Sequence, residues 1–429
     1  MKSYIDIIIA TLIFIIIIIY NSIQKHKNKN YLKKDLYKKT NLLSKILYLI
    51  STLTFIIFLI INLVINGNDT SIEATITYIL NALSISLIIF PLSLNTLYLK
   101  YFKDEEKYSH IKTIITTKIT KHLLKKYNKA GINIIILSNI EQQLDIKSIE
   151  EKEFKKSHLK KTLQIKTDNL NLLDKYLVES TIIKETKNLD NLYKQIYNSR
   201  GLHDNYIKSI KYILTTHIPL IISNIILTIL GFPPTINLLL VGILKLITIY
   251  NIDCIYKKLP YEKDIMERKP KPSNILIAKQ EILFILIESF CITFLTTVPY
   301  MGCLSGGSSL IFANTLYLLI YFYSCLFLTY SYSNDTFIII NLIKSYKHLP
   351  TFIYTILFII FIVSLNFIPY LNTENVGLKN NLSSMLFGFL TIILLEIIKL
   401  ARFTTMKGNK KNEHKNNKKH KRSKLNNSW

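Results

Sequence analysis

The sequence predicts an all-α polytopic membrane protein of about nine transmembrane helices, with a small reduced α/β cytoplasmic domain between the third and fourth. Three observations predict this class. Hydrophobic residues make up 49% of the 429 residues and charged residues only 19%, whereas soluble domains carry about 25% charge. The apolar residues are gathered in long runs, and the connecting loops alternate between Lys-rich and Lys-free. With only 11 Gly and 10 Pro, the composition excludes collagen-like and linker-rich chains.

A helical run of about 20 apolar residues crosses the hydrocarbon core of a bilayer. The runs that qualify are residues 4–21, 45–66, 76–99, 213–231, 236–256, 281–300, 309–332, 350–371 and 383–402. The first run lacks the basic start and the small-residue cleavage site of a signal peptide, so we expect a retained anchor. The predicted domains are the anchor (1–24), two spans (25–100), a cytoplasmic domain (101–204), six spans (205–403) and a basic tail (404–429).

The loops predict the orientation of the chain, because short loops rich in Lys and Arg stay in the cytoplasm. The loop 22–44 carries seven Lys residues, whereas the loop 67–75 has no Lys or Arg. The same alternation continues to the strongly basic tail. It predicts a multi-pass protein of the cell (inner or cytoplasmic) membrane, with the N-terminus outside and the C-terminus in the cytoplasm.

The cytoplasmic segment carries one α/β signal. The run LLKKYNKAGINIIILSN predicts a helix that ends at Gly131 and then a buried strand over Ile132–Leu137. The remainder, residues 141–200, is polar and predicted to be mostly helical. No phosphate-binding P-loop, GxGxxG or GxSxG occurs in the chain. The four cysteines show no CxxC or Cys/His spacing, so we expect no metal site of that kind and no cofactor.

Residues Asp204–Pro272 read DNYIKSIKYILTTHIPLI…LPYEKDIMERKPKP. This segment resembles the fifth and sixth membrane helices of P-type cation-transporting ATPases of the calcium-pump type, and EKDIMERKP is its most specific part. Residues 315–403 resemble the last three helices of that family, and KKTNLLSKILYLISTL and ISLIIFPLSLNTL resemble its third and fourth. KKYNKAGINIIILSN resembles part of the phosphorylation domain. The resemblance implies a six-helix C-terminal membrane domain at 205–403 and a phosphorylation-domain remnant at 101–204.

The chain departs from the family at the catalytic positions. It has no DKTGT and no TGDGxND motif, and Ser138, Asn139 and Ile140 stand where the family has TGD. The nucleotide-binding and actuator domains have no counterpart, and a single anchor stands in place of the first two family helices. Phosphoryl transfer needs a nucleophile, a metal site and phosphate-binding groups together. We therefore expect no catalytic residue and no ATPase activity of the chain by itself.

The resemblance also places the family's ion-binding positions. Pro91 matches the Pro of the family's PEGL motif, but Leu92 follows it where the family has Glu. His217, Lys245 and Thr248 occupy positions where the family has Asn, Asn and Thr. A calcium ion needs six or more oxygen ligands, so we expect no metal site. The candidates for an ion pathway are Pro91, His217, Lys245, Thr248 and Glu288.

Each charged or titratable candidate has two interpretations. A charge at the centre of a span costs about 2.5–3.5 kcal/mol, so something should offset Lys245. Lys245 is either a tethered cation in the old ion site, which locks the bundle or serves a proton or anion path, or a structural Lys that is neutral or snorkels towards Asp253. His217 either titrates or packs between helices. Glu288 serves either transport or an inter-helix pair. Glu396 and Lys399, three residues apart, are expected to form a structural pair.

The tail from Lys407 to Lys424 is predicted to be disordered and to bind anionic lipids of the bilayer. No aromatic residue interleaves with its charges before Trp429, so nucleic acid is not an expected partner.

Three functions follow from these features. The first is a catalytically inactive scaffold or accessory protein. The second is a passive or partner-driven cation or proton transporter. The third is the membrane subunit of a split P-type ATPase that a separate polypeptide completes. The missing first helices predict an exposed flank, which a membrane partner, a cytoplasmic partner or a second copy would cover.

Overall fold

The structure is a computed structural model. It describes residues 2–27, 35–66, 79–88 without 81 and 85, 111–116, 120–137, 163–165, 181–183, 189–235, 238–251, 255–268 without 263, 277, 279–333, 349–367 and 373–400. The predicted pathway residue Pro91 and the basic tail from Lys407 lie outside these residues.

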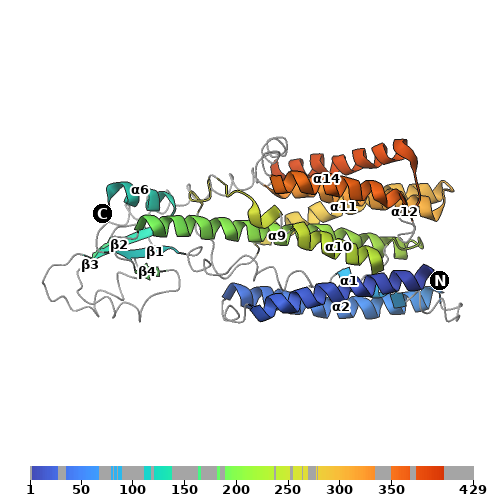
Figure 1. Cartoon of the computed structure of the whole chain (residues 1–429), viewed down its shortest axis with the longest axis horizontal. Coiled ribbons are helices and arrows are strands. Elements are labelled where there is room, and N and C mark those ends of the chain that lie inside the picture. Colours follow the sequence, from blue (N-terminus) through green and yellow to red (C-terminus); the bar gives the residue numbers. More distant parts are fainter. Residues whose placement is uncertain are drawn as a thin grey trace, which may run out of the picture.

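Long apolar helices dominate the fold (Figure 1). Five of them are long and apolar enough to cross a membrane: α9 (Leu189–Ile229), α11 (Lys279–Ser305), α12 (Leu310–Ser333), the segment Pro350–Phe367 that overlaps α14 (Leu349–Ser364), and the last helix, Gly377–Leu400. Shorter apolar helices lie within three further predicted spans, at Thr11–Tyr20 in α1 (Lys2–Lys27), Asn41–Ile57 in α2 (Asp35–Asn66) and α10 (Leu238–Tyr250). The chain is thus a multi-pass membrane protein. The number nine stays a prediction, because the span 76–99 is described only in part.

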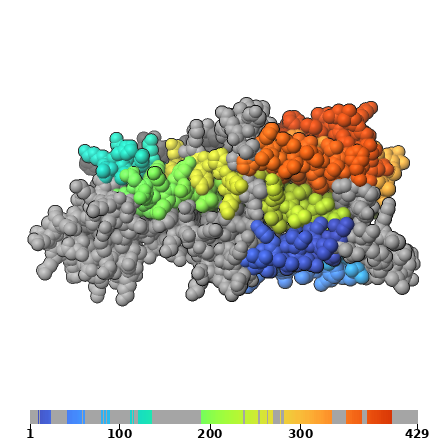
Figure 2. All heavy atoms as spheres, in the orientation of Figure 1, coloured from blue at the N-terminus to red at the C-terminus, as the bar shows by residue number. Residues whose placement is uncertain are grey.

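The outer faces of the helices are apolar. Leu49 of α2, Phe290 of α11 and Leu386 of the last helix are 63%, 58% and 66% exposed. Large exposed apolar surfaces of this kind mark contact with a membrane or a partner. Figure 2 shows the flank formed by α1 and the C-terminal helices on the side facing the viewer. These faces agree with a lipid bilayer as the surrounding medium.

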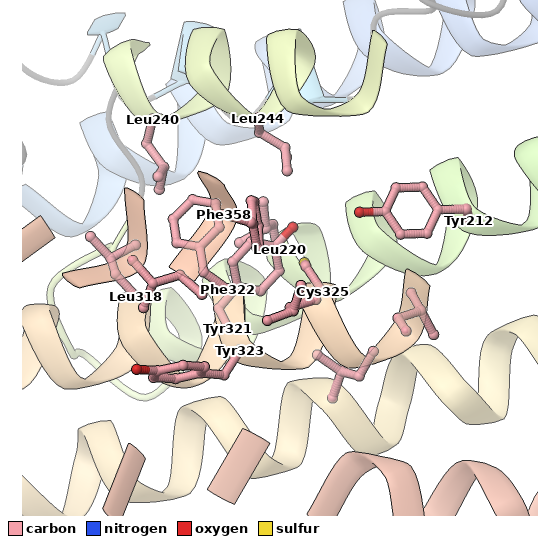
Figure 3. Close-up of a cluster of buried hydrophobic side chains, with 14 of the residues drawn as sticks. Tyr212, Leu220, Leu240, Leu244, Leu318, Tyr321, Phe322, Tyr323, Cys325 and Phe358 are labelled. Carbon is pink, nitrogen blue, oxygen red and sulfur yellow. The ribbon is translucent and has the colours of Figure 1, made fainter. Parts of the chain in front are cut away.

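The centre of the bundle is α12, most of which is buried because it packs against α9, α11 and α14. A shared apolar cluster fills the space between these helices and α10. Figure 3 shows Leu220 of α9, Leu240 and Leu244 of α10, Phe322 of α12 and Phe358 in this cluster. The cluster fixes the helices that carry the predicted pathway residues.

The first span, which the sequence could not place, packs against α10. The contact runs through Gly242, where a Cβ atom would lie 3.1 Å from the nearest side-chain atom of Ile13. The absent side chain lets the two helices approach each other closely, as small residues do between membrane helices.

Outside the bundle, four short strands form a parallel sheet in the order β3-β2-β1-β4. They are β1 (Thr113–Thr116), β2 (Asn133–Leu137), β3 (Leu163–Ile165) and β4 (Thr181–Ile183). Between β1 and β2 lies α6 (Lys121–Lys129), whose first turn is capped by the Thr120 side chain. The chain leaves the helix through Gly131 at φ 67°, a conformation that glycine adopts readily. The predicted helix and strand around Gly131 are therefore present.

Of the region 141–200, predicted to be mostly helical, the structure describes residues 189–200 as helix and the two strands β3 and β4, which the sequence did not predict. Both are runs of three residues that pair with the neighbouring strands β2 and β1. Segments this short carry little periodic signal, so pairing partners distant in sequence decide their conformation. Much of 101–188 lies outside the described residues, and the complete α/β domain stays a prediction.

The helix α9 joins the sheet to the bundle without a break, so the predicted boundary at residue 204 falls inside a helix. Its first residue accepts a hydrogen bond from the Tyr127 hydroxyl at 2.7 Å. Burial, together with the charge of Asp190, raises the pKa of that hydroxyl. Further along, Arg200 donates to the carbonyls of Ala130 and Arg268 at 3.0 and 3.2 Å. These bonds fix α9 to both parts of the molecule.

Candidate ion-pathway site

Lys245 lies inside the bundle, on α10, and is only 2% exposed. Its ammonium nitrogen donates to the backbone carbonyl of Ile88, in the third predicted span, at 2.8 Å. The side chain therefore runs into the protein, and the snorkelling interpretation does not describe it. Asp253, to which that interpretation referred, lies outside the described residues. The bond joins two segments that are 157 residues apart in the sequence.

His217 is buried in α9, where its Nδ1 lies 2.7 Å from the carbonyl oxygen of Ile213 and 3.1 Å from the hydroxyl of Thr216. A carbonyl only accepts, so the first contact places the proton on Nδ1. Nε2 is then left as an acceptor, and it has no hydrogen-bond partner in the described part of the chain. The Lys245 ammonium is near enough to act on this ring electrostatically. Two basic side chains thus share the interface between α9 and α10.

Thr248 lies one turn after Lys245 on α10 and is buried. Its hydroxyl donates to the carbonyl of Leu244, in its own helix, at 2.8 Å. Thr side chains in apolar helices commonly make this local bond. Thr248 therefore lies one turn from Lys245 on the same helix, and its hydroxyl proton is bonded within that helix.

Glu288 lies on a different seam of the bundle, between α9, α11 and α12. It is 2% exposed and accepts a hydrogen bond from the Tyr332 hydroxyl through Oε2. The Tyr332 oxygen also lies 2.7 Å from the hydroxyl of Thr215. The five candidates are therefore not one cluster. His217 and Lys245 come together, Glu288 belongs to a second polar group, and Pro91 is outside the described residues.

Buried tyrosines supply polar contacts that the sequence analysis missed. Asn251 donates to the hydroxyls of Tyr212 and Tyr354 at 2.6 and 2.9 Å. Tyr317 bonds the hydroxyl of Ser223 at 2.6 Å, and Tyr321 donates to the carbonyl of Thr216 at 2.7 Å. The spacing of four between Tyr317 and Tyr321 puts both on one face of a helix. That spacing was the sequence signal that could have indicated these buried tyrosines, in a chain with 27 Tyr.

An ion cluster closes the end of the bundle nearest the sheet. Lys208 of α9 lies 3.1 Å from a carboxylate oxygen of Asp204 and 2.5 Å from one of Glu262. Arg268 contacts Glu262 as well and lies 2.9 Å from Asp264. The most family-like part of the sequence, EKDIMERKP, therefore supplies three members of this cluster. It anchors the loop that follows α10 to α9.

In the part of the chain that the structure describes, no group of three or more His, Cys, Asp or Glu side chains could hold a metal ion. The described polar groups of the bundle are instead a buried Lys245 amine bonded to a carbonyl, an imidazole with one ring nitrogen bonded, and a separate buried carboxyl that accepts from a tyrosine hydroxyl.

These features define a multi-pass membrane protein with a charged residue bonded inside its helix bundle. Residues 259–401 match the family model described as "Cation transporting ATPase, C-terminus". This part of the chain is thus similar to the C-terminal membrane region of P-type cation-transporting ATPases, as its resemblance predicted. The match covers 143 of the 429 residues, counted from 259 to 401 inclusive. No curated protein matches the chain.

Proposed function

We propose that the chain is a membrane module of the P-type ATPase kind that performs no ATPase chemistry by itself and acts as a scaffold or accessory protein. The observation that carries the proposal is the Lys245 ammonium bonded to the Ile88 carbonyl within the bundle. By the family resemblance, Lys245 occupies a position at which the family binds its ion. A positive charge in a medium of low dielectric constant repels other cations strongly. The ammonium form of Lys245 therefore disfavours entry of a metal cation between α9 and α10.

The sequence supports the same conclusion from the catalytic side. The aspartate of DKTGT, the magnesium-binding motif and the nucleotide-binding domain are all missing between Lys100 and Gly201. Since phosphoryl transfer requires these parts together, a chain that lacks them has no means of driving transport with ATP. The retained parts are the helix bundle, the continuous α9 and the ion cluster at its end. These parts stabilise the fold, and none of them takes part in phosphoryl transfer.

The test is ion flux into liposomes that contain the purified protein, without ATP, alongside ATP hydrolysis in solution. We expect no hydrolysis and no flux of cations or protons by the unaltered chain. In Lys245→Ala, we expect a measurable cation leak, because the repelling charge has been removed. His217→Ala should show a smaller leak. Lys194→Ala, which removes an exposed Lys outside the apolar part of α9, is the matched control and should behave like the unaltered chain.

Two results would overturn the proposal. ATP hydrolysis by the purified chain would show that catalysis survives without the family motifs. Cation flux through the unaltered protein that Lys245→Ala and His217→Ala abolish would make it a passive transporter.

A passive or partner-driven transporter is the second candidate, and Glu288 favours it. Ionisable residues inside a membrane bundle commonly mark ion or proton paths. The third candidate, a subunit of a split ATPase, predicts a stable cytoplasmic partner that carries DKTGT. Purification under mild conditions, followed by identification of the bound proteins, distinguishes that candidate from the others.

The positive-inside pattern supports an orientation with the N-terminus outside and the C-terminus in the cytoplasm. The polybasic tail supports contact with anionic lipid on that side. The orientation is testable with a tag at each end of the chain, by comparing which tag is accessible to an antibody in intact cells and in permeabilised cells.

A further inference from the structure

Glu288 is a buried carboxyl that the proposed function does not use. It lies in the second turn of the apolar part of α11, and only 2% of it is exposed. A carboxylate in such a place is costly unless its oxygens are hydrogen-bonded. The contacts around it therefore indicate how the group is kept in the bundle.

The hydrogen bonds around Glu288 form a chain with a direction. The Tyr332 hydroxyl donates to Oε2 of Glu288. A phenol has a single proton, so Tyr332 must accept from its other neighbour, the hydroxyl of Thr215 at 2.7 Å. The order is then Thr215 to Tyr332 to Glu288, with one residue from each of α9, α12 and α11. The chain ends on a carboxylate oxygen as the acceptor.

A second carboxylate lies on the same face of α11, nearer the end of the bundle that adjoins the sheet. Glu281 precedes Glu288 by seven residues, which is close to two full turns or about 10 Å along the helix. Glu281 pairs with Lys211 of α9, and its side chain is 18% exposed. Lys211 in turn precedes Thr215 by one turn of α9. A partly exposed ion pair therefore lies between the water and the buried carboxyl.

Two titratable groups act on Glu288 directly, Tyr332 on α12 and Cys291 one turn further along α11. The Lys211–Glu281 ion pair joins α9 to α11 two turns before Glu288. Two further cations lie at the end of α12 that carries Tyr332. Lys399 donates to the carbonyl of Ser331 at 2.7 Å, and Lys208 lies 3.5 Å from that of Ser333. Cations at the carboxyl end of a helix are stabilised by its dipole.

We propose that Glu288 is a proton-binding site inside the membrane, which exchanges its proton with water at the Lys211–Glu281 end of the bundle. When the carboxylate gains a proton, it becomes a donor as well as an acceptor. The Tyr332 proton is then free to turn towards Thr215, and the direction of the chain reverses. Proton occupancy of Glu288 thus sets how Tyr332 ties α9, α11 and α12 together. Proton exchange at Glu288 goes beyond the proposed scaffold function, because a scaffold does not need a side chain that changes its charge.

The test uses dicyclohexylcarbodiimide, an apolar reagent that modifies protonated carboxyls in apolar surroundings. A carboxyl oxygen adds to the carbodiimide carbon while the carboxyl proton moves to a nitrogen, and the adduct rearranges to a stable acylurea with no group lost. The full-length protein in liposomes is treated over a pH series, and the peptide containing Glu288 is quantified by mass spectrometry. We expect labelling at low pH that falls about tenfold per pH unit above the titration midpoint.

Three variants sharpen the result. Glu288→Gln should lose the label on this peptide. Tyr332→Phe should increase labelling at a given pH, because the ionised carboxyl has lost a donor, whereas a purely structural role of Tyr332 would leave the pH profile in place. The matched control is Glu374→Gln, which removes a partly exposed carboxylate at the opposite end of α12, where it accepts from the Ser309 hydroxyl at 3.1 Å, and should leave the labelling of Glu288 unchanged.

Two outcomes would overturn the proposal: no labelling of Glu288 at any pH in the unaltered protein, or labelling that is the same at every pH. Both are measured on the unaltered chain, so neither depends on whether a variant folds. The reaction requires neither flux nor ATP hydrolysis. Its failure would therefore leave the proposed scaffold function untouched, and flux through the bundle would leave the labelling result valid.

Discussion

At the scale of single residues, the buried charged side chains that the structure describes in the bundle are bonded to neighbouring protein groups. Lys208 is the clearest case, because its side chain is 6% exposed and it contacts Asp204 and Glu262 together. Removing one member of a buried ion cluster leaves the others without compensation. The buried carbonyl of Ile88 likewise accepts its hydrogen bond from the Lys245 side chain.

We expect Lys208→Met to lower the free energy of unfolding by about 3–5 kcal/mol, because Asp204 and Glu262 lose their buried cation and keep only the more exposed Arg268. The measurement is the thermal or denaturant unfolding of the purified protein in detergent. Lys194→Met, at an exposed position of the same helix, should have almost no effect. A loss below about 1 kcal/mol, the range of exposed pairs, would show that the cluster is not buried in solution.

Sequence reasoning found the residues of the site more easily than their partners. Lys245, His217 and Glu288 attract attention as polar residues in apolar runs, and a hydropathy pattern reveals them directly. The carbonyl of Ile88 cannot be found in this way, because every residue has a carbonyl. Tyr332 and Thr215 are also inconspicuous in a chain with 27 Tyr. Only their distances to Glu288 and to each other give them a role.

At the scale of elements, close helix approach depends on a few glycines. Gly388 in the last helix faces α12, where a Cβ atom would lie 2.5 Å from the Cβ of Tyr323 and 3.3 Å from the backbone nitrogen of Ser324. Neither atom is the flexible end of a side chain, so the helices themselves would have to move apart. Small residues at such crossings allow the backbones to pack closely in membranes.

We therefore expect Gly388→Ala to destabilise the protein by about 1–3 kcal/mol, the usual cost of overpacking. The control is Gly302→Ala in α11, where a Cβ would meet no atom within 4 Å and the change should be neutral or slightly stabilising. Both variants are compared by their unfolding temperature in the same detergent. Equal stability of the two variants would contradict the observed packing of the last helix against α12.

At the scale of the whole molecule, the bundle includes the first helix, α1, which packs against α10, the helix that carries Lys245. The Cβ of Ile13 lies 3.5 Å from the place of a Cβ at position 242. This distance lies within the range of Cβ separations found in disulfides, about 3.5–4.5 Å.

We expect Ile13→Cys combined with Gly242→Cys, in a background without the native cysteines, to form an intramolecular disulfide under mild oxidation. Non-reducing gel mobility and peptide mass spectrometry detect it. Leu12→Cys combined with Gly242→Cys is the matched control, because Leu12 is 54% exposed on the outer side of the helix. Equal cross-linking of both pairs would show that α1 does not occupy a fixed place on α10.

The sequence alone determined that the chain is a multi-pass, mostly helical membrane protein, and it revealed the similarity of its C-terminal part to cation-transporting ATPases. Hydropathy is a local property, and a run of apolar residues must form a helix in a membrane because its backbone groups need internal partners. The tertiary structure decided the place of α1, the strands β3 and β4, the partner of Lys245 and the hydrogen-bond chain at Glu288. These depend on contacts between residues far apart in the sequence, whose energies no local pattern contains.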